Sequence, residues 1–314
     1  MSKVVSNFYT ISATTEPEHK IFYRLYVPDD NQIVATLLLV HGMQEHSGRY
    51  EELASYLTTQ NFAVLTYDQL GHGKTALQVD QLGYFKKHGA KKQLIDDAIT
   101  MSNFLRETYP QLPQFILGHS MGSFVTRCVL QKIGRQFKGA IIVGTGQRQK
   151  GSMAFRLLLT LLNSIAPKGR SKLINRIFDK RNNARFKNEP NQNNSNWLSI
   201  SKTNRISFLE DPLCGGLFTN NGFHTVLDLS LQATAIEATK NIPKNLPIVF
   251  ISGQDDPIGD FGIGVEKSAA QLRAQGQTDI TLKLYAGMRH EILNEDCKME
   301  VFQFISSWLH RHLL

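Results

Sequence analysis

The chain has 314 residues, 41% of them hydrophobic, and a formal net charge of +8 at pH 7. This composition is typical of a globular protein and argues against a disordered or repetitive chain. No apolar run approaches the ~18–20 residues that a transmembrane helix needs, and residues 1–20 lack the apolar core of a secretory signal. Cys128, Cys214 and Cys297 match neither a disulfide framework nor a metal site. We therefore expect a cytoplasmic protein without a bound metal.

The first predicted elements are a hairpin and two buried strands. Asn7–Ile11 and Ile21–Val27 are rich in β-forming residues and flank a polar turn at Glu16-Pro17-Glu18, which is typical of a β-hairpin. Ala35–Val40 and Phe62–Tyr67 are continuous apolar runs without polar alternation, so we expect strands that are buried on both faces.

Strands and helices then alternate through the first half of the chain. The further predicted elements of this half are helices over Arg49–Gln60, Gln93–Tyr109 and Met121–Ile133, and strands over Gln114–Gly118 and Gly139–Val143. Such alternation predicts an α/β fold with a doubly wound, mostly parallel sheet.

The alternation stops after residue 146 and resumes near residue 240. Residues 147–239 are helix-prone and show no buried strand pattern. The last predicted elements are strands over Pro247–Ser252 and Ile280–Tyr285, a helix near Val265–Gln275 and a final helix from Asp296 to about His310. We therefore predict a core of residues 1–146 and 240–314, with residues 147–239 as a helical cap inserted after the sixth strand.

The predicted cap carries most of the positive charge. Eleven basic residues lie between residues 148 and 187, and Asp179 is the one acidic residue among them. The basic residues are Arg148, Lys150, Arg156, Lys168, Arg170, Lys172, Arg176, Lys180, Arg181, Arg185 and Lys187. Such a block can face nucleic acid, an anionic membrane or an anionic substrate, or it is a solvated surface. The apolar stretch Met153–Leu162 beside it is consistent with a peripheral membrane contact. We expect no nucleic-acid partner, and the sequence leaves the oligomeric state open.

Gly118-His119-Ser120-Met121-Gly122 is the motif that carries most information about chemistry. It is a G-x-S-x-G sequence between a predicted buried strand and a predicted helix. In that context the serine lies on a strained turn, and glycine two residues away on either side avoids collision with neighbouring backbone. The motif therefore predicts Ser120 as a nucleophile.

A serine nucleophile needs a base, an acid that orients the base, and donors for the oxyanion. His290 follows the last predicted strand, whereas His224 lies in the predicted cap and His310 and His312 lie in or beside the last helix, so we predict His290 as the base. Asp256 follows the strand Pro247–Ser252 in a G-x-x-D spacing and is the predicted acid, with its neighbour Asp255 as the alternative. The backbone N–H groups of Met43 and Met121 are the predicted oxyanion donors.

Three segments resemble a known family of α/β-hydrolases. His41–Tyr50 is similar to the H-G-x-x-E-H-S-x-R-Y signature of monoacylglycerol lipases and related lysophospholipases, Tyr67–Gly73 to their D-x-x-G-H-G turn, and Gly118–Gly122 to their G-H-S-M-G. Asp256 and His290 fall where that family has its acid and base. Gln69 and the second aspartate, Asp255, depart from the family pattern, and the resemblance fades through the predicted cap.

The resemblance implies a serine carboxylic-ester hydrolase that needs no cofactor. It implies a substrate such as a monoacylglycerol or lysophospholipid, an acyl-serine intermediate, and an acyl chain that lies under the cap. His119 would line the side of the pocket that takes the alcohol, and Glu45, His46 and Arg49 would brace the oxyanion loop. The alternatives are a peptidase of the proline-iminopeptidase type and a ligand receptor that keeps the catalytic triad and hydrolyses its ligand slowly.

Overall fold

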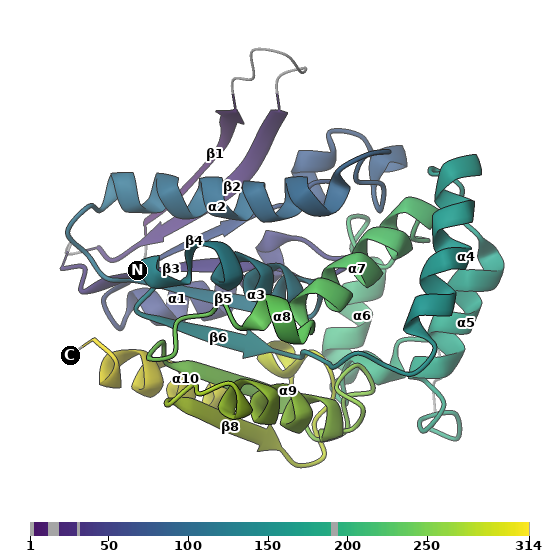
Figure 1. Cartoon of the computed structure of the whole chain (residues 1–314). Helices are drawn as coiled ribbons and strands as arrows, with labels where there is room; N and C mark the ends of the chain where they lie inside the picture. Colours follow the sequence, from purple (N-terminus) through teal and green to yellow (C-terminus); the bar gives the residue numbers. More distant parts are fainter. Residues whose placement is uncertain (1–2, 12–18, 30–31, 190–193, 314) are drawn as a thin grey trace.

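The computed structural model describes residues 3–11, 19–29, 32–189 and 194–313, and its centre is one eight-stranded sheet (Figure 1). The strand order is β1-β2-β4-β3-β5-β6-β7-β8. The strands are β1 (Lys3–Ile11), β2 (His19–Val27), β3 (Ala35–Val40), β4 (Phe62–Tyr67), β5 (Gln114–His119), β6 (Gly139–Val143), β7 (Ile248–Gly253) and β8 (Ile280–Tyr285). β1 pairs antiparallel with β2, and β2 pairs antiparallel with β4. All other pairings are parallel, as the sequence predicted.

The parallel strands end in register, which brings the loops that follow them together. Val40 pairs with Gly118, and His119 pairs with Val143, so β3, β5 and β6 reach the same edge of the sheet. Every residue of β3, β4, β5, β6 and β7 is buried. Unbroken burial explains why these strands read as continuous apolar runs in the sequence.

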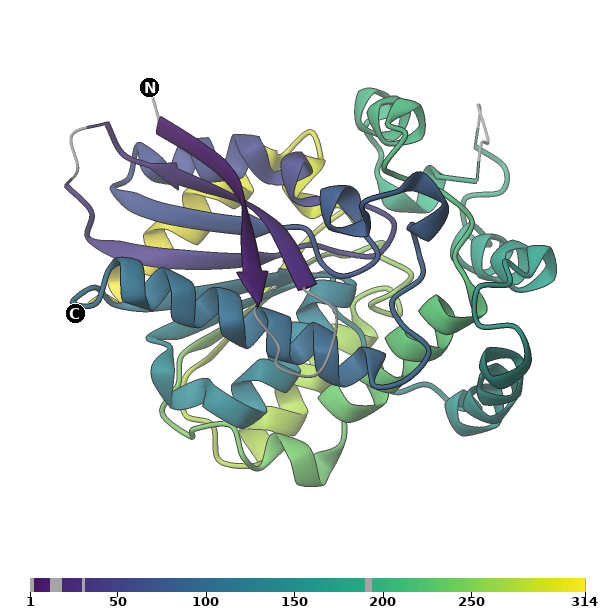
Figure 2. The ribbon, with the colours of Figure 1, turned by 90° about the horizontal axis from the view of Figure 1, so that it is seen from above.

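Helices cover both faces of the sheet (Figure 2). The helices outside the β6–β7 connection are α1 (Glu51–Thr58), α2 (Ala90–Thr108), α3 (Met121–Ile133), α9 (Ile263–Ala274) and α10 (Lys298–Arg311). α1 and α10 share one apolar cluster, which contains Leu57 and Trp308. α2, α3 and α9 share the cluster on the other face, which contains Met101, Val125 and Leu272. This two-faced covering makes the sheet a doubly wound α/β structure.

The connection between β6 and β7 is helical. Its helices are α4 (Ser152–Ile165), α5 (Lys172–Asn182), α6 (Lys202–Glu210), α7 (Asn220–Ala233) and α8 (Ile236–Thr239), and no strand occurs in its described residues. We call residues 147–239 the insertion. α4, α5 and α6 stand beyond the carboxyl edge of the sheet (Figure 1). α7 packs against both α4 and α3, and its residues Leu229 and Ala233 belong to the main core cluster, so it connects the insertion to the core.

The boundaries differ from the predictions in a few places. The hairpin is confirmed, and its first strand begins at Lys3, earlier than predicted. The predicted turn at Glu16-Pro17-Glu18 lies outside the described residues. α1 starts only at Glu51 because Ser47–Tyr50 forms a 3₁₀ turn. α10 starts at Lys298, two residues later than predicted.

Candidate active site

Ser120 lies on a strained turn between β5 and α3. Its backbone has φ 52° and ψ −119°, which is unfavourable for any residue except glycine. A Cβ atom on Gly118 would lie 2.3 Å from the carbonyl oxygen of Gly122, and one on Gly122 would lie 2.1 Å from that of Val40. Both glycines are therefore required by close backbone approach around the serine.

Ser120, His290 and Asp256 form a hydrogen-bonded chain. The Ser120 hydroxyl lies 2.8 Å from Nε2 of His290, and Nδ1 of His290 lies 2.9 Å from Oδ2 of Asp256. Asp256 is fully buried, and its other oxygen accepts the backbone N–H of Ile258 at 2.8 Å. Asp256 accepts a hydrogen bond from the N–H at Nδ1 of His290, which leaves Nε2 free to accept the serine proton. Asp255 makes no contact with His290 among the described hydrogen bonds.

Trp197 covers the imidazole of His290. The two ring centroids are 5.0 Å apart with an interplanar angle of 34°. Trp197 is buried and lines the same cavity as Ser120. Sequence reasoning missed this residue, because it follows a polar stretch of the insertion and reaches His290 only through the fold.

Met43 and Met121 also border this cavity. Met121 is the first residue of α3, and the first N–H groups of a helix have no carbonyl partner within the helix. The positive end of the helix dipole also points towards the serine. Met43 follows Gly42 in the loop after β3, beside Ser120: a Cβ atom on Gly42 would lie 3.0 Å from Cβ of Ser120. The predicted oxyanion donors thus lie around the nucleophile, and their role stays a prediction.

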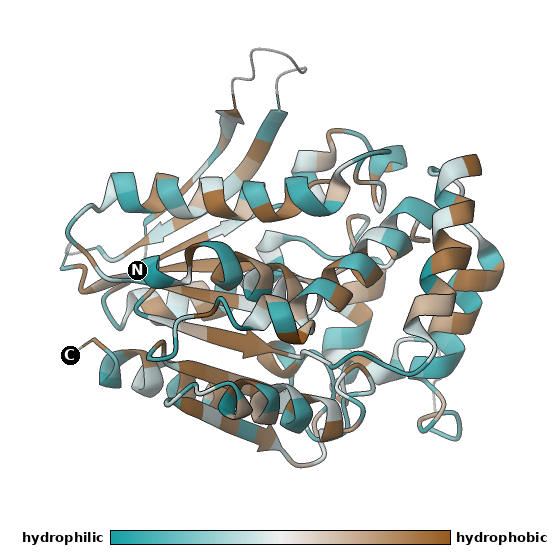
Figure 3. Cartoon of the chain, viewed as in Figure 1, coloured by the Kyte–Doolittle hydropathy of each residue, from teal (hydrophilic) through white to brown (hydrophobic). Residues whose placement is uncertain are grey.

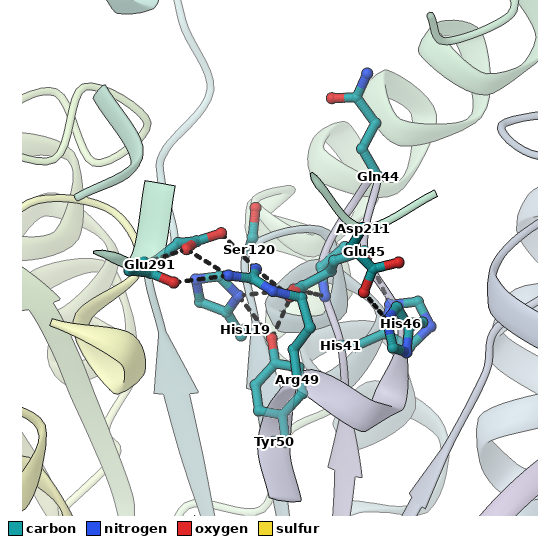
Figure 4. Close-up of polar contacts among 12 residues, drawn as sticks. His41, Gln44, Glu45, His46, Arg49, Tyr50, His119, Ser120, Asp211 and Glu291 are labelled. Carbon is teal, nitrogen blue, oxygen red and sulfur yellow. Dashed lines mark hydrogen bonds and ion pairs between the residues drawn. The ribbon is translucent and has the colours of Figure 1, made fainter. Parts of the chain in front are cut away.

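A buried carboxylate, Glu45, holds the loop that carries Met43 (Figure 4). Its Oε1 accepts the backbone N–H of Gly42 at 2.5 Å and the hydroxyl of Tyr50 at 2.6 Å. Its Oε2 accepts a guanidinium N–H of Arg49 at 3.1 Å. Arg49 in turn donates twice to Glu291, at 2.6 and 2.8 Å. The charges therefore join the loop after β3 to the residue that follows His290.

His119 lies between the same two loops. Its Nδ1 is 3.1 Å from Oε1 of Glu45, and its Nε2 is 3.2 Å from the backbone carbonyl oxygen of His290. Burial opposes a charge on His119, but the hydrogen bond and the negative charge of Glu45 outweigh it and raise the pKa of His119. For Glu45 burial acts in the opposite direction, and His119 and Arg49 together lower the pKa of the carboxyl. His119 borders the cavity, where its role in substrate binding stays a prediction.

Two uncharged histidines brace the other side of the loop. Nε2 of His41 accepts the backbone N–H of Gln69 at 2.9 Å, and Nε2 of His72 accepts that of Gln44 at 3.2 Å. Burial is the largest cause that lowers the pKa of both histidines, and it lowers the pKa of His72 to about 3. Gln69, which departs from the family pattern, also donates its side-chain amide to the carbonyl oxygen of His41 at 2.6 Å. Gln69 thus links the segment after β4 to the loop after β3.

The cavity above Ser120 has a volume of about 270 Å³, and we call it the catalytic cavity. One wall consists of the loops that carry Met43, Ser120 and His290. The opposite wall comes from the insertion. Its apolar side chains are Phe178, Trp197, Leu198, Phe208, Leu209, Leu217 and Val226. The sequence placed the insertion over the serine but did not identify these side chains, because each depends on how helices of the insertion pack.

His46, Asp211 and Cys214 are close enough to be considered as metal ligands, with their ligand atoms within 4.8 Å of one another. Nδ1 of His46 accepts the N–H of Gly48, so its Nε2 carries the proton that it shares with Asp211 at 2.8 Å. Burial raises the pKa of the Cys214 thiol far above its usual value, whereas a metal ligand must be a thiolate. These groups therefore fit a loop contact better than a metal centre.

Comparison with known proteins identifies the family. The family described as serine aminopeptidase, S33, matches residues 31–297. The monoglyceride lipase of Mus musculus is 25% identical over 296 residues, which cover 92% of this chain and 86% of that protein. The monoglyceride lipase of Homo sapiens is 26% identical over 290 residues, with coverage of 88% and 82%.

Solved structures agree with the fold. A highly thermostable carboxyl esterase from Bacillus coagulans in complex with glycerol superposes with a TM-score of 0.88 at 25% identity, over 98% of this chain and 99% of that one. A soluble variant of the monoglyceride lipase from Saccharomyces cerevisiae superposes with a TM-score of 0.76 at 21% identity, over 98% and 96%. Together with the sheet order, the strained serine and the family match, these findings show that the chain belongs to the S33 family of α/β-hydrolases.

Proposed function

We propose that this carboxylic-ester hydrolase cleaves acyl monoesters of glycerol or of glycerophosphate compounds through an acyl-serine intermediate. The observation that carries the proposal is the hydrogen-bonded chain from Ser120 through His290 to Asp256, at the floor of a cavity with an apolar wall. The monoglyceride lipases to which the chain is similar support the class of substrate.

In this mechanism Ser120 attacks the ester carbonyl while Nε2 of His290 accepts the hydroxyl proton. Asp256 stabilises the imidazolium that forms. The negative charge on the carbonyl oxygen is held by the backbone N–H groups of Met43 and Met121. His290 then gives its proton to the leaving alcohol and activates a water molecule, which hydrolyses the acyl-serine. The step consumes one water and releases a fatty acid and an alcohol.

We also propose that the insertion, residues 147–239, acts as a cap that encloses the acyl chain. Its aromatic and aliphatic side chains form the wall of the catalytic cavity opposite Ser120. Burial of apolar surface from the substrate against this wall contributes about 25 cal/mol per Å². An acyl chain therefore gains binding energy there that a short acyl group lacks.

Peptidase activity is the main alternative, since the family description names an aminopeptidase. A free N-terminal amine requires a carboxylate that is available to bind it. Glu45 and Glu291 border the catalytic cavity, but both are held by Arg49. Asp179 is the other carboxylate on the cavity wall. The contacts of Glu45 and Glu291 therefore favour a neutral ester over a charged amine.

The test is a series of monoacylglycerols and p-nitrophenyl esters of increasing acyl length, with proline p-nitroanilide as the peptidase substrate. We expect kcat/KM to rise with acyl length and no release from the anilide. Ser120→Ala should abolish ester cleavage, and a fluorophosphonate probe should label the wild type at Ser120. Labelling of another serine, or faster cleavage of the anilide, would refute the proposal.

A second candidate function is peripheral binding to an anionic membrane. α4 exposes several apolar side chains, among them Leu157 at 68% and Ile165 at 73% relative exposure. Figure 3 shows that much of the ribbon of α4 is hydrophobic. Of the eleven basic residues between 148 and 187, Arg156 lies on α4, four lie on α5 and the others lie outside these two helices. None of the helices in the described residues combines the length and apolarity that crossing a bilayer requires. An apolar helix face with flanking cations suits the surface of a bilayer.

A further inference from the structure

Two further chambers adjoin the catalytic cavity, and they differ in chemistry. One has a volume of about 330 Å³ and shares Met43, Phe124, Phe178, Val226 and Ile258 with the catalytic cavity. We call it the apolar chamber. Its further apolar side chains are Phe155, Phe223, Leu227 and Pro257, and Arg148, Lys150 and Arg181 also border it.

The other chamber has a volume of about 700 Å³ and shares Asn175, Asp179, Asn194 and Leu217 with the catalytic cavity. We call it the cationic chamber. Its basic lining residues are Lys172, Arg176, Lys180 and Lys187. Helix α5 divides the two chambers: Phe178 and Arg181 border the apolar chamber, whereas the basic residues at 172, 176 and 180 border the cationic one.

The cations of this chamber are not paired with any carboxylate of the described residues. None of Lys172, Arg176, Lys180 and Lys187 takes part in an ion pair there. Lys172, Arg176 and Lys180 follow one another at i, i+4 spacing on α5, where like charges destabilise a helix. An anion between them would remove this repulsion. The stripe is therefore not a device for helix stability, and its charges are available to an anion.

The boundary between the catalytic and cationic chambers is polar. Asp179 and Asn194 line both chambers there. Burial raises the pKa of the Asp179 carboxyl. A hydroxyl-bearing linker such as glycerol suits this boundary, since Asp179 and Asn194 offer hydrogen-bond acceptors and donors.

We propose that the cationic chamber binds the phosphate of a monoacyl glycerophosphate ester whose ester group lies at Ser120 and whose acyl chain occupies the apolar chamber. This inference rests on the proposed esterase function and specifies its substrate. A single extended amphipathic molecule would then place each of its three parts in a chamber of matching chemistry. Arginine and lysine bind phosphate through charge-assisted hydrogen bonds, which are stronger than bonds between neutral groups.

The test compares two soluble substrates with the same octanoyl chain, the ester of glycerol 3-phosphate and the ester of glycerol. Short chains keep both substrates monomeric, so binding to a lipid surface plays no part. We expect the wild type to prefer the phosphate ester. In Arg176→Gln/Lys180→Gln the ratio of kcat/KM, phosphate ester over neutral ester, should fall at least about tenfold, mainly through KM.

The matched control is Lys202→Gln/Lys267→Gln, which removes the same charge from exposed positions outside all three chambers. It should leave the ratio unchanged. The proposal is wrong if both double variants lower the ratio equally, if neither does, or if the wild type shows no preference. Inorganic phosphate should inhibit cleavage of the phosphate ester and leave cleavage of the neutral ester unchanged. If it inhibits both esters equally, the chamber binds a free anion and not the phosphate of the substrate, and the proposal is wrong. Failure of the wild type to cleave either ester would overturn the esterase proposal as well.

Discussion

The two walls of the catalytic cavity are built on different principles. The core wall consists of buried charges and histidines whose polar atoms bind one another, as in Glu45, Arg49 and Glu291. The wall from the insertion consists of apolar side chains, and behind it α4 presents exposed leucines and α5 carries basic residues that line the cationic chamber. A buried polar network holds atoms in one arrangement, because any displacement leaves a buried group without its partner. Under the proposed function, the core wall performs the chemistry and the insertion selects the substrate.

The largest effect is expected from the residue that orients the catalytic base. Asp256→Asn should lower kcat on a short ester by about 10⁴-fold, since the amide no longer holds His290 in the reactive tautomer. Steady-state kinetics with a p-nitrophenyl ester would measure it. Asp255→Asn is the matched control, because Asp255 is adjacent in sequence but makes no contact with His290 in the described hydrogen bonds. A larger loss from Asp255→Asn would transfer the role to that residue.

The next effect concerns the network behind the oxyanion loop. Glu45→Gln leaves the cations of Arg49 and His119 without one of their buried carboxylates, and this should lower the free energy of unfolding by about 3–5 kcal/mol. It should also lower kcat, because Gly42 loses a charged acceptor and the loop that carries Met43 loosens. Urea denaturation would measure the first and short-ester kinetics the second. Glu51→Gln, at an exposed site in the first turn of α1, should change neither quantity.

The core wall could be predicted from the sequence further than the insertion. Its residues lie in short motifs, so Ser120, Met43 and His119 are identified by their distance from a strand end. The contacts of Glu45 with His119 and of Arg49 with Glu291 could not be predicted, because they join segments that are far apart in the chain. In the insertion the sequence predicts helices, but which side of each helix faces the cavity depends on packing.

Trp197 and α5 illustrate that limit. Trp197 belongs to a short 3₁₀ turn after a polar stretch, and no local pattern relates it to His290. In α5 the cations at positions 172, 176 and 180 are visible as a stripe in the sequence, but their position beside the catalytic cavity is not. The eleven basic residues therefore divide into groups with different surroundings only once the fold is known.

A smaller effect should follow from pH. His72 is buried and uncharged with a pKa of about 3, against 6.5 for an ordinary histidine. The unfolded chain takes up a proton at this residue below about pH 6.5, and the folded chain does not, so stability must fall as the pH falls from 6.5 towards about 3. The free energy of unfolding then changes by about 1.4 kcal/mol per pH unit where the unfolded chain binds one proton more than the folded chain.

His72→Gln removes this titration and keeps an acceptor for the N–H of Gln44. The variant should therefore lose less stability than the wild type between about pH 6 and pH 4. Urea denaturation at about pH 6 and pH 4 gives the pH dependence of the free energy of unfolding for the wild type and for the variant. Parallel slopes for wild type and variant would show that His72 is charged in the folded protein.

The smallest effect tests the outer surface of the insertion. If α4 lies on a membrane, Leu157→Ser/Leu161→Ser removes two exposed side chains, at 68% and 57% relative exposure, from the contact. Binding to anionic vesicles should weaken at least about tenfold, while cleavage of a soluble short ester should stay the same, because neither leucine lines the catalytic cavity. Val79→Ser/Met299→Ser removes exposed apolar side chains elsewhere, at 68% and 48%, and should not affect binding.

Salt should weaken the binding of the wild type, since the basic residues of the insertion attract the anionic surface within a Debye length of about 10 Å. Sedimentation with vesicles measures all of these, and equal sedimentation with neutral and anionic vesicles at low salt would leave α4 and its cations as a solvated surface.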